Sequence, residues 1–334
     1  MIRKSVLAAI AGLFFFGFGG LTVSAAPLKV GLVLDKGGKD DKSFNAAAYA
    51  GAMKAQKEFG IEVKTVEATD DNAVESLHRS FAKKEFDLVF GIGIAQMEAV
   101  KKVSAQFPSQ KFAIVDAEVA NPNVRTLLFE EHQGSYLVGA VAALTSKTGK
   151  IGFIGGMDIP LIRRFQLGFE EGAKKINPKV QVSANYIGVT GEAWNNPAKA
   201  KELALAQYDG GADVVFAAAG ASNLGLFDAA EERGRYAIGV DSNQDWIKPG
   251  RILTSMLKRV DIAVYETIRD TKEGKFTPGV MRFGLANDGV DYSLDEFNRK
   301  LLPQATLKKV DALKKDIIAG KIKVPDYYLT NAKK

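Results

Sequence analysis

The sequence predicts an α/β protein built from two doubly wound parallel sheets. Short apolar runs rich in β-branched residues alternate along the chain with segments of helical periodicity. The runs are apolar throughout, which is typical of strands that helices cover on both faces. About 300 residues follow the amino-terminal apolar segment, a length that suits two domains better than one. Strand–helix repetition at this density therefore predicts two lobes, each with about half of the chain.

The elements follow one another in a regular order. Each strand is placed on an apolar run, at residues 29–34, 62–68, 87–93, 112–117, 150–155, 181–187, 213–219 and 236–241. Good helix formers with apolar residues three and four apart fill the segments between these runs. We expect helices at residues 43–59, 73–84, 96–107, 133–146, 161–175, 197–208 and 224–233. This alternation predicts parallel strands joined by helical crossovers.

No flexible linker rich in glycine and serine separates the two predicted sheets. Instead the chain contains extended runs at residues 123–129, 251–256 and 280–285, with a helix expected at 259–271. Three crossings of this kind would restrict the lobes to opening and closing about one axis. We assign residues 26–128 and 256–275 to an N-terminal lobe, and residues 129–255 and 276–334 to a C-terminal lobe.

The first 25 residues have the pattern of a secretory signal peptide. Arg3 and Lys4 form a basic start, residues 6–18 are almost all apolar, and small residues follow at 23–26. We expect cleavage after Ala25. The apolar run is also near the length that spans a bilayer, so an uncleaved anchor is the alternative.

The cysteine content and the charge limit the compartments and the partners that are consistent with the sequence. The chain contains no cysteine, which excludes disulfides and a lipid-modified cysteine behind the signal peptide. We therefore expect a protein that is free in the periplasm and acts as a monomer. Removing the two basic residues of the signal peptide lowers the formal net charge from +6 to +4. The remaining basic residues are scattered, mostly near predicted helix ends where cations favour the helix dipole, so we expect no nucleic-acid partner.

Aspartates follow three of the predicted strands, where the chain reaches the carboxyl edge of a sheet. Asp35 ends the first strand, Asp116 the fourth and Asp241 the last. Ligands of open parallel sheets bind beyond this edge. A single aspartate at such a junction often caps the next helix, which is the alternative. Because a buried carboxylate is costly without a partner and both lobes contribute, we expect the three aspartates to converge on a polar ligand.

Three sequence blocks connect these aspartates to a known family. They are DKGG followed by DKSFN at 35–45, AIGVDS at 237–242 and LTSMLKRVD at 253–261. With the stretch 213–225 and KIKVP at 321–325, they resemble the basic membrane protein family. Its members are substrate-binding proteins of ABC transporters, typified by bacterial purine nucleoside receptors. The resemblance covers about residues 29–326 and implies the type I periplasmic-binding-protein fold, with a three-crossing hinge.

The resemblance implies which residues contact the base. The family's aspartates at the ends of the first and fourth strands contact the nucleoside, and they match Asp35 and Asp116. The phenylalanine of the DKSFN block, Phe44, stacks on the purine, and its partner on the other face is expected at Phe216. Stacking on an aromatic ring contributes about 1–3 kcal/mol per base. For both phenylalanines, a place in the hydrophobic core is the alternative.

The resemblance also implies the rest of the site. In the family, the residues that match Asp241 and Lys258 hold the ribose, and charge-assisted hydrogen bonds of this kind are strong. Gly220 lies where the backbone approaches the base. Asp41 and Asn45 of the DKSFN block complete the first-lobe part of the expected site.

Two features depart from the family pattern. Many members are lipoproteins, whereas this chain lacks the required cysteine. Residues 188–195 and 219–223 also differ from the commoner pattern of those segments. Trp194, within the first segment, is expected near the cleft, where it would replace or supplement a stacking ring.

Residues suited to catalysis are scarce. Only two histidines are present, and no cysteine nucleophile, Gly-x-Ser-x-Gly turn or dinucleotide-binding glycine pattern occurs. His78 is expected on a solvent-facing helix surface, and His132 in a crossing region within reach of the cleft. The acidic residues 40–41 with Asp35 raise a metal-assisted nucleoside hydrolase as the enzymatic alternative, but Lys42 makes this loop a poor cation site. We expect no catalytic residue, cofactor or metal.

The sequence therefore predicts a periplasmic binding protein, not an enzyme, that delivers a purine nucleoside to ABC-transporter permease subunits. Three cleft carboxylates would repel a phosphate, so the ligand is expected to be a nucleoside without one. Riboflavin or a sugar is the alternative ligand, and a ligand sensor for a membrane receptor is the alternative role. A LacI-type regulator is excluded, because the signal peptide stands in place of a DNA-binding headpiece.

Overall fold

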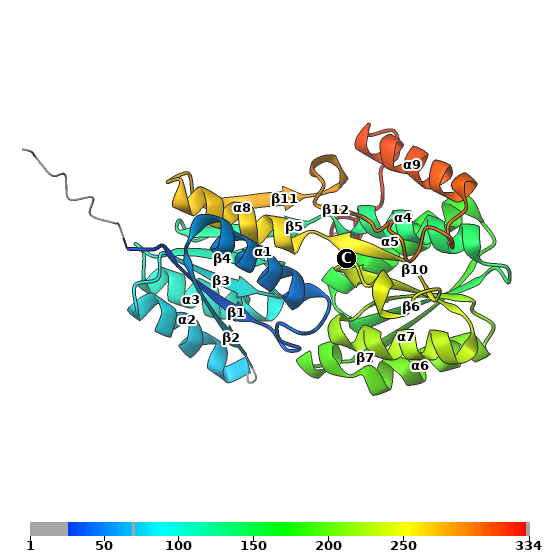
Figure 1. Ribbon diagram of the computed structural model, residues 1–334, viewed down its shortest axis with the longest axis horizontal. Helices are drawn as coiled ribbons and strands as arrows, with labels where there is room; N and C mark the ends of the chain where they lie inside the picture. The colour runs from blue at the N-terminus through cyan, green and yellow to red at the C-terminus, as the bar shows by residue number, and fades with distance from the viewer. Residues whose placement is uncertain (1–25, 69–70, 332–334) are drawn as a thin grey trace, which may run out of the picture.

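The computed structural model describes residues 26–68 and 71–331; the expected signal peptide, residues 1–25, lies outside these ranges. The chain folds into two α/β lobes that lie side by side (Figure 1). Each lobe is built on a six-stranded sheet with helices on both faces. This arrangement confirms the predicted fold class. Within the described ranges, each helix is too short or too polar to cross a membrane.

The N-terminal lobe contains a parallel sheet in the order β11-β5-β4-β3-β1-β2. Its strands are β1 (Lys29–Leu34), β2 (Glu62–Glu67), β3 (Leu88–Ile92), β4 (Lys111–Val115), β5 (Val124–Phe129) and β11 (Gly279–Phe283). One face is covered by α1 (Phe44–Phe59) packed on α8 (Val260–Lys272), the other by α2 (Val74–Lys83) and α3 (Met97–Gln106). Short 3₁₀ turns η1 (Asp71–Ala73) and η2 (Ile94–Gln96) precede α2 and α3. After their first residues, the inner strands β1, β3 and β4 are apolar because both of their faces are buried.

The C-terminal lobe repeats this plan, with the sheet order β12-β10-β9-β8-β6-β7 and β12 antiparallel at one edge. Its strands are β6 (Lys150–Met157), β7 (Gln181–Gly188), β8 (Val214–Ala218), β9 (Tyr236–Asp241), β10 (Ile252–Lys258) and β12 (Val290–Tyr292). The helices are α4 (Glu131–Thr145), α5 (Pro160–Ile176), α6 (Pro197–Asp209), α7 (Asn223–Arg233), α9 (Gln304–Ile318) and α10 (Tyr327–Asn331). The 3₁₀ turns are η3 (Gly191–Asn195), η4 (Gly220–Ser222), η5 (Asp245–Ile247) and η6 (Leu285–Asn287). α4 pairs with α5 and α6 pairs with α7, while α9 rests on α4 and α10 on α5.

Glycines allow α4 and α5 to pack with their backbones nearly in contact. A Cβ atom at Gly139 would lie 2.1 Å from the carbonyl oxygen of Phe169, and one at Gly172 would lie 1.9 Å from that of Tyr136. Neither distance is possible for a real side chain. The glycines therefore fix the separation of the two helices, and α5 is the helix that carries several residues of the site described below.

One strand lies in a different lobe from the one assigned by sequence. β11 pairs in parallel with β5, from Gly279 beside Arg125 to Phe283 beside Phe129, so residues 279–283 belong to the N-terminal lobe. Residues 256–258, assigned to that lobe, instead complete β10 in the C-terminal sheet. An extended run carries no local signal for its distant partner, and β11 is a largely exposed edge strand. The chain thus crosses between the lobes after β5, after β10 and after β11.

His78 is buried, contrary to the expected solvent-facing position. Its exposed fraction is 0%, and its Nε2 atom lies 2.8 Å from Oε1 of Gln96. The ring packs against Gly91 of β3, where a Cβ atom would lie 3.3 Å from it. Burial lowers the pKa of His78 to about 4, so the residue is a neutral core side chain at pH 7.

Candidate functional site

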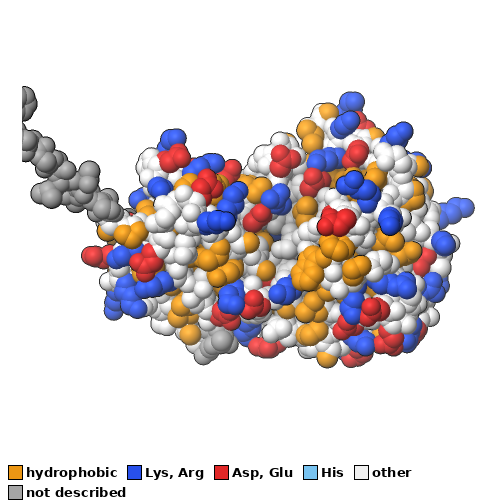
Figure 2. Space-filling model, in the orientation of Figure 1, with side chains coloured by type: hydrophobic (Ala, Val, Ile, Leu, Met, Phe, Trp, Pro, Cys, Tyr) orange, Lys and Arg blue, Asp and Glu red, His pale blue; other side chains and the backbone are white. Residues whose placement is uncertain are grey.

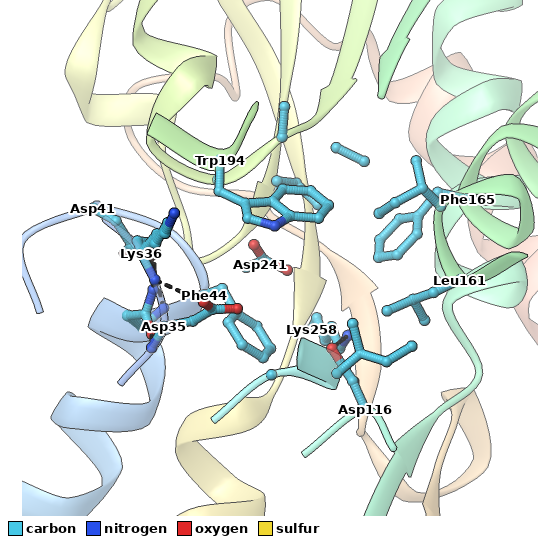
Figure 3. A pocket seen from close by; sticks show the side chains of 18 residues that line it. Asp35, Lys36, Asp41, Phe44, Asp116, Leu161, Phe165, Trp194, Asp241 and Lys258 are labelled. Carbon is cyan, nitrogen blue, oxygen red and sulfur yellow. Dashed lines mark hydrogen bonds and ion pairs between the residues drawn. The ribbon is translucent and has the colours of Figure 1, made fainter. Parts of the chain in front are cut away.

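A cavity lies between the lobes, at the carboxyl ends of the parallel strands. Figure 3 shows that both lobes contribute side chains to it. Of the ten residues expected in the site, nine line this cavity: Asp35, Asp41, Phe44, Asn45, Asp116, Trp194, Gly220, Asp241 and Lys258. The tenth, Phe216, does not.

Asp116 and Asp241 line the cavity, and both have the same left-handed backbone conformation. Asp116 directly follows β4, and Asp241 is the last residue of β9. Their φ angles are 70° and 64°. Aspartate is one of the few non-glycine residues that adopt this conformation readily. The turn ends the strand and leaves the carboxylate at the sheet edge, where the residue lines the cavity.

Asp41 holds the loop before α1 and has little capacity left for a ligand. Its Oδ1 atom accepts hydrogen bonds from the backbone N–H groups of Ser43 and Ala46 at 2.8 and 2.9 Å. Its Oδ2 atom accepts from the backbone and the side-chain amide of Asn45 at 2.8 and 3.0 Å. The expected ligand contact of this carboxylate is therefore replaced by a helix-capping role, because the first amides of α1 have no partner within the helix.

Asn45 ties the same loop to the first strand. Its Oδ1 atom accepts a hydrogen bond from the backbone N–H of Asp35 at 2.9 Å, and Nδ2 reaches the carbonyl oxygen of Lys36 at 3.4 Å. Phe44, the residue before it, is thereby held with its ring at the cavity.

The two aromatic rings on opposite sides of the cavity are Phe44 and Trp194, and Asp241 lies between them in Figure 3. Phe216 is fully buried in the core, with ring centroids 5.6 Å from Phe153 and 5.3 Å from Phe169. The stacking role expected for Phe216 is therefore wrong, because its side chain points from β8 into the helix layer of α5.

A third ring, Phe165 of α5, also lines the cavity and was missed by the sequence analysis. It lies four residues after Leu161, which lines the cavity as well, so the two share one helix face. That face begins directly after β6, at the same sheet edge as the predicted aspartates. The place of α5 directly after a strand end is the signal by which Phe165 could have been found.

Gly220 brings the backbone close to Trp194. It has a left-handed φ of 60°, and a Cβ atom there would lie 3.1 Å from the carbonyl oxygen of Trp194. A larger residue would strain this turn and push the indole out of place.

Lys258 is the buried cation of the site. Its Nζ atom lies 2.6 Å from Oδ2 of Asp116 and 3.1 Å from Oε1 of Glu131. The rings of Phe44 and Phe165 lie 5.2 and 5.6 Å from the ammonium, within the range of cation–π attraction. Burial disfavours the ammonium, but the surrounding carboxylates more than offset this and raise the pKa of Lys258, so it stays charged.

One oxygen of Asp116 has no hydrogen-bond partner among the described residues. Oδ2 faces Lys258, whereas Oδ1 is buried and unpaired. Burial raises the pKa of the Asp116 carboxyl to about 6, and Lys258 opposes that rise. A buried acceptor without a donor is costly, so this atom is suited to accept a hydrogen bond from a ligand in the cavity.

Direct contacts join the two lobes around the cavity. Ser43 Oγ donates to Oδ2 of Asp241 at 2.5 Å, and Ser242 Oγ donates to the carbonyl oxygen of Ser43 at 2.9 Å. The ammonium of Lys36 lies 2.7 Å from the carboxylate of Glu192 in η3. The structure is therefore the closed form, in which residues of both lobes meet over the cavity.

Replacing Asp241 by asparagine should flatten the pH dependence of stability. Burial raises the pKa of Asp241 to about 7, opposed by Lys258 and by the hydrogen bond from Ser43. A carboxyl with a raised folded pKa stabilises the fold at low pH, and that contribution is lost as the pH rises through the folded pKa. The ligand-free wild type should therefore lose more unfolding free energy between about pH 5 and pH 8 than Asp241→Asn does. Urea unfolding at both pH values measures this; equal losses would show that the pKa of Asp241 is not raised in the folded protein.

A cluster of possible metal ligands lies outside the cavity wall but already holds a cation. Glu130, His132 and Asp326 place ligand atoms within 4.8 Å of one another. The guanidinium of Arg164 contacts all three, at 3.4, 3.1 and 3.0 Å. Burial and the adjacent Arg164 lower the pKa of His132 to about 4. His132 thus belongs to a buried ion network, and it does not line the cavity.

Comparison with known proteins agrees with this geometry. The chain matches the family described as ABC transporter substrate-binding protein PnrA-like over residues 28–327. It is 35% identical to the CD4+ T-cell-stimulating antigen of Listeria innocua, covering 91% of this chain and 89% of that protein. It is 33% identical to the ABC transporter nucleoside-binding protein BmpA of Lactococcus lactis, covering 89% of each chain. A solute-binding protein of an ABC transporter system from Aeropyrum pernix superposes with a TM-score of 0.81 at 31% identity, covering 90% of this chain and 94% of that one.

Proposed function

Because this chain belongs to the PnrA-like family of ABC transporter substrate-binding proteins, we propose that it binds a purine nucleoside between its lobes. The observation that carries the proposal is the pairing of two facing rings, Phe44 and Trp194, with buried acceptors at the edge of the space between them. Flat polarisable bases stack on aromatic rings at about 1–3 kcal/mol each. Ribose hydroxyls and base N–H groups can donate hydrogen bonds to the carboxylates of Asp116 and Asp241.

The charge of the cavity favours a nucleoside over a nucleotide. Asp35, Asp116 and Asp241 line the cavity. The basic residues of its lining are Lys36 and Lys258. Lys258 is already paired with two carboxylates, and Lys36 with Glu192 at the rim. A phosphate would therefore meet more negative than positive charge inside a site of low dielectric constant.

Closure is the proposed mechanism of capture. Phe44 and Asp116 come from the N-terminal lobe, whereas Trp194 and Asp241 come from the C-terminal lobe. A ligand that touches both pairs makes contacts that the open form cannot make, which is the condition for shifting a conformational equilibrium. We propose that the closed form is then read by the permease subunits of an ABC importer, and that the protein acts in the periplasm as a monomer without catalytic activity.

A calorimetric titration tests the proposal. Guanosine, adenosine or inosine should bind with one site per chain, and the corresponding 5′-monophosphates should bind at least about 100-fold more weakly because of the charge balance described above. Riboflavin and ribose serve as the alternative ligands in the same experiment. Tight binding of a monophosphate, or of riboflavin or ribose in preference to every purine nucleoside, would contradict the proposal.

A further inference from the structure

A chain of alternating charges leads from the cavity to the carboxyl-terminal tail. Lys258 Nζ has Asp116 on its cavity side at 2.6 Å and Oε1 of Glu131 on the other side at 3.1 Å. The second oxygen of Glu131 accepts a hydrogen bond from Nη1 of Arg164. Arg164 in turn donates from Nε and Nη2 to the two oxygens of Asp326, at 2.8 and 3.0 Å.

The members of this chain are shielded from water. The exposed fractions of the side chains are 2% for Lys258, 1% for Glu131, 3% for Arg164 and 15% for Asp326. The ring of Tyr328 lies 4.8 Å from the guanidinium and covers it on the tail side. Buried charges are stable only with partners, so each member depends on its neighbours for its position.

The network also lies on the first crossing between the lobes. Nη1 of Arg164 donates to the carbonyl oxygen of Phe129, the last residue of β5, at 2.7 Å. Two residues later Glu131 begins α4, while Arg164 belongs to α5 of the C-terminal lobe. The guanidinium of Arg164 therefore connects the carboxyl-terminal tail to a junction of both lobes.

From these contacts we infer that Asp326 is a positioning residue for ligand binding: through Arg164 and Glu131 it fixes the ammonium of Lys258 at the cavity wall. Without the Asp326 carboxylate, Arg164 keeps Glu130 and Glu131 as its acidic partners and draws Glu131 away from Lys258. Lys258 then loses one of its two carboxylates and its defined place. The inference takes its ligand from the proposed function, but the ion chain itself does not depend on it.

Asp326→Asn in the exported protein tests the inference by removing the charge at constant size. The variant should bind guanosine about three- to tenfold more weakly than the wild type, the range expected for coupling through a shared ion network. Asp316→Asn is the matched control, because Asp316 lies in the same part of the chain in an exposed pair with Lys321 at 3.4 Å. The control should bind guanosine like the wild type. If the wild type binds guanosine and Asp326→Asn binds it equally well, the inference is wrong.

A second arm needs no ligand and separates the inference from the proposed function. Urea unfolding midpoints of Asp326→Asn, Lys258→Met and the double variant form a double-mutant cycle. Sites without shared partners usually give additive effects, whereas coupling through Arg164 and Glu131 predicts a double variant that is less destabilised than the sum. Additive midpoints would overturn the inference. A non-additive cycle in a protein that binds no purine nucleoside would support the positioning chain and refute the nucleoside proposal.

Discussion

Replacing Lys258 with methionine should lower the free energy of unfolding of the ligand-free protein by about 3–5 kcal/mol, the typical cost of breaking a buried ion pair. The side chain is 2% exposed, and its ammonium is shared by Asp116 and Glu131. Methionine fills the space but leaves Asp116 without its ion-pair partner, and Glu131 keeps only Arg164. Urea unfolding at pH 7 measures the loss.

The pH dependence of this variant separates lost charge from lost packing. Without the ammonium, the buried Asp116 carboxyl, whose pKa burial already raises, keeps a proton that the unfolded chain releases, so stability falls as the pH rises. The deficit of Lys258→Met relative to the wild type should therefore be smaller at about pH 5 than at about pH 8. Lys201→Met, which breaks an exposed pair with Glu232, is the control and should leave the unfolding midpoint nearly unchanged. A deficit independent of pH would mean that Lys258 acts by packing alone.

Trp194→Ala and Phe44→Ala should each weaken nucleoside binding about 5- to 150-fold, which corresponds to the loss of one stacking contact of about 1–3 kcal/mol. Both rings line the cavity from opposite lobes. The measurement is calorimetric titration with guanosine. If Trp194→Ala binds guanosine like the wild type, the indole is not a stacking ring.

The chain provides two matched controls for the stacking prediction. Trp246 is the second tryptophan; it is 49% exposed and is not part of the cavity lining, so Trp246→Ala should retain full affinity. Phe216→Ala should instead destabilise the fold by about 3–5 kcal/mol, as expected for a fully buried phenylalanine. A loss of affinity in Phe216→Ala without a loss of stability would contradict the core position of that ring.

The strand ends were predictable because two simple signals coincide there. Buried parallel strands are continuous apolar runs, so β1 and β9 have the bounds expected from sequence, Lys29–Leu34 and Tyr236–Asp241. A charged residue that interrupts such a run is placed at the sheet edge by topology alone. This is why Asp116 and Asp241, from different lobes, could be assigned to one site.

The remainder of the site depends on information that sequence does not carry locally. An apolar run does not show which face each side chain occupies, so Phe216 could not be told apart from a cavity residue before its contacts with Phe153 and Phe169 were known. Glu131 follows β5 and Arg164 follows β6, 33 residues apart in the sequence, and only the tertiary fold brings them together.

The distribution of charge on the surface does not form one basic patch on the face in view. Figure 2 shows lysine and arginine interspersed with aspartate and glutamate on the face in view, as expected for solvated helix surfaces. Lys258, Asp116 and Asp241, by contrast, are buried together in the lining of the cavity between the lobes.

Mass spectrometry of the small molecules released when the purified protein is denatured tests the central claim most directly. Residues of both lobes meet beside the cavity, so a ligand bound there in the cell should be retained through purification. We predict that the released ligand is a purine nucleoside without a phosphate. Recovery of a nucleotide, a flavin or a free sugar in stoichiometric amount would contradict the account.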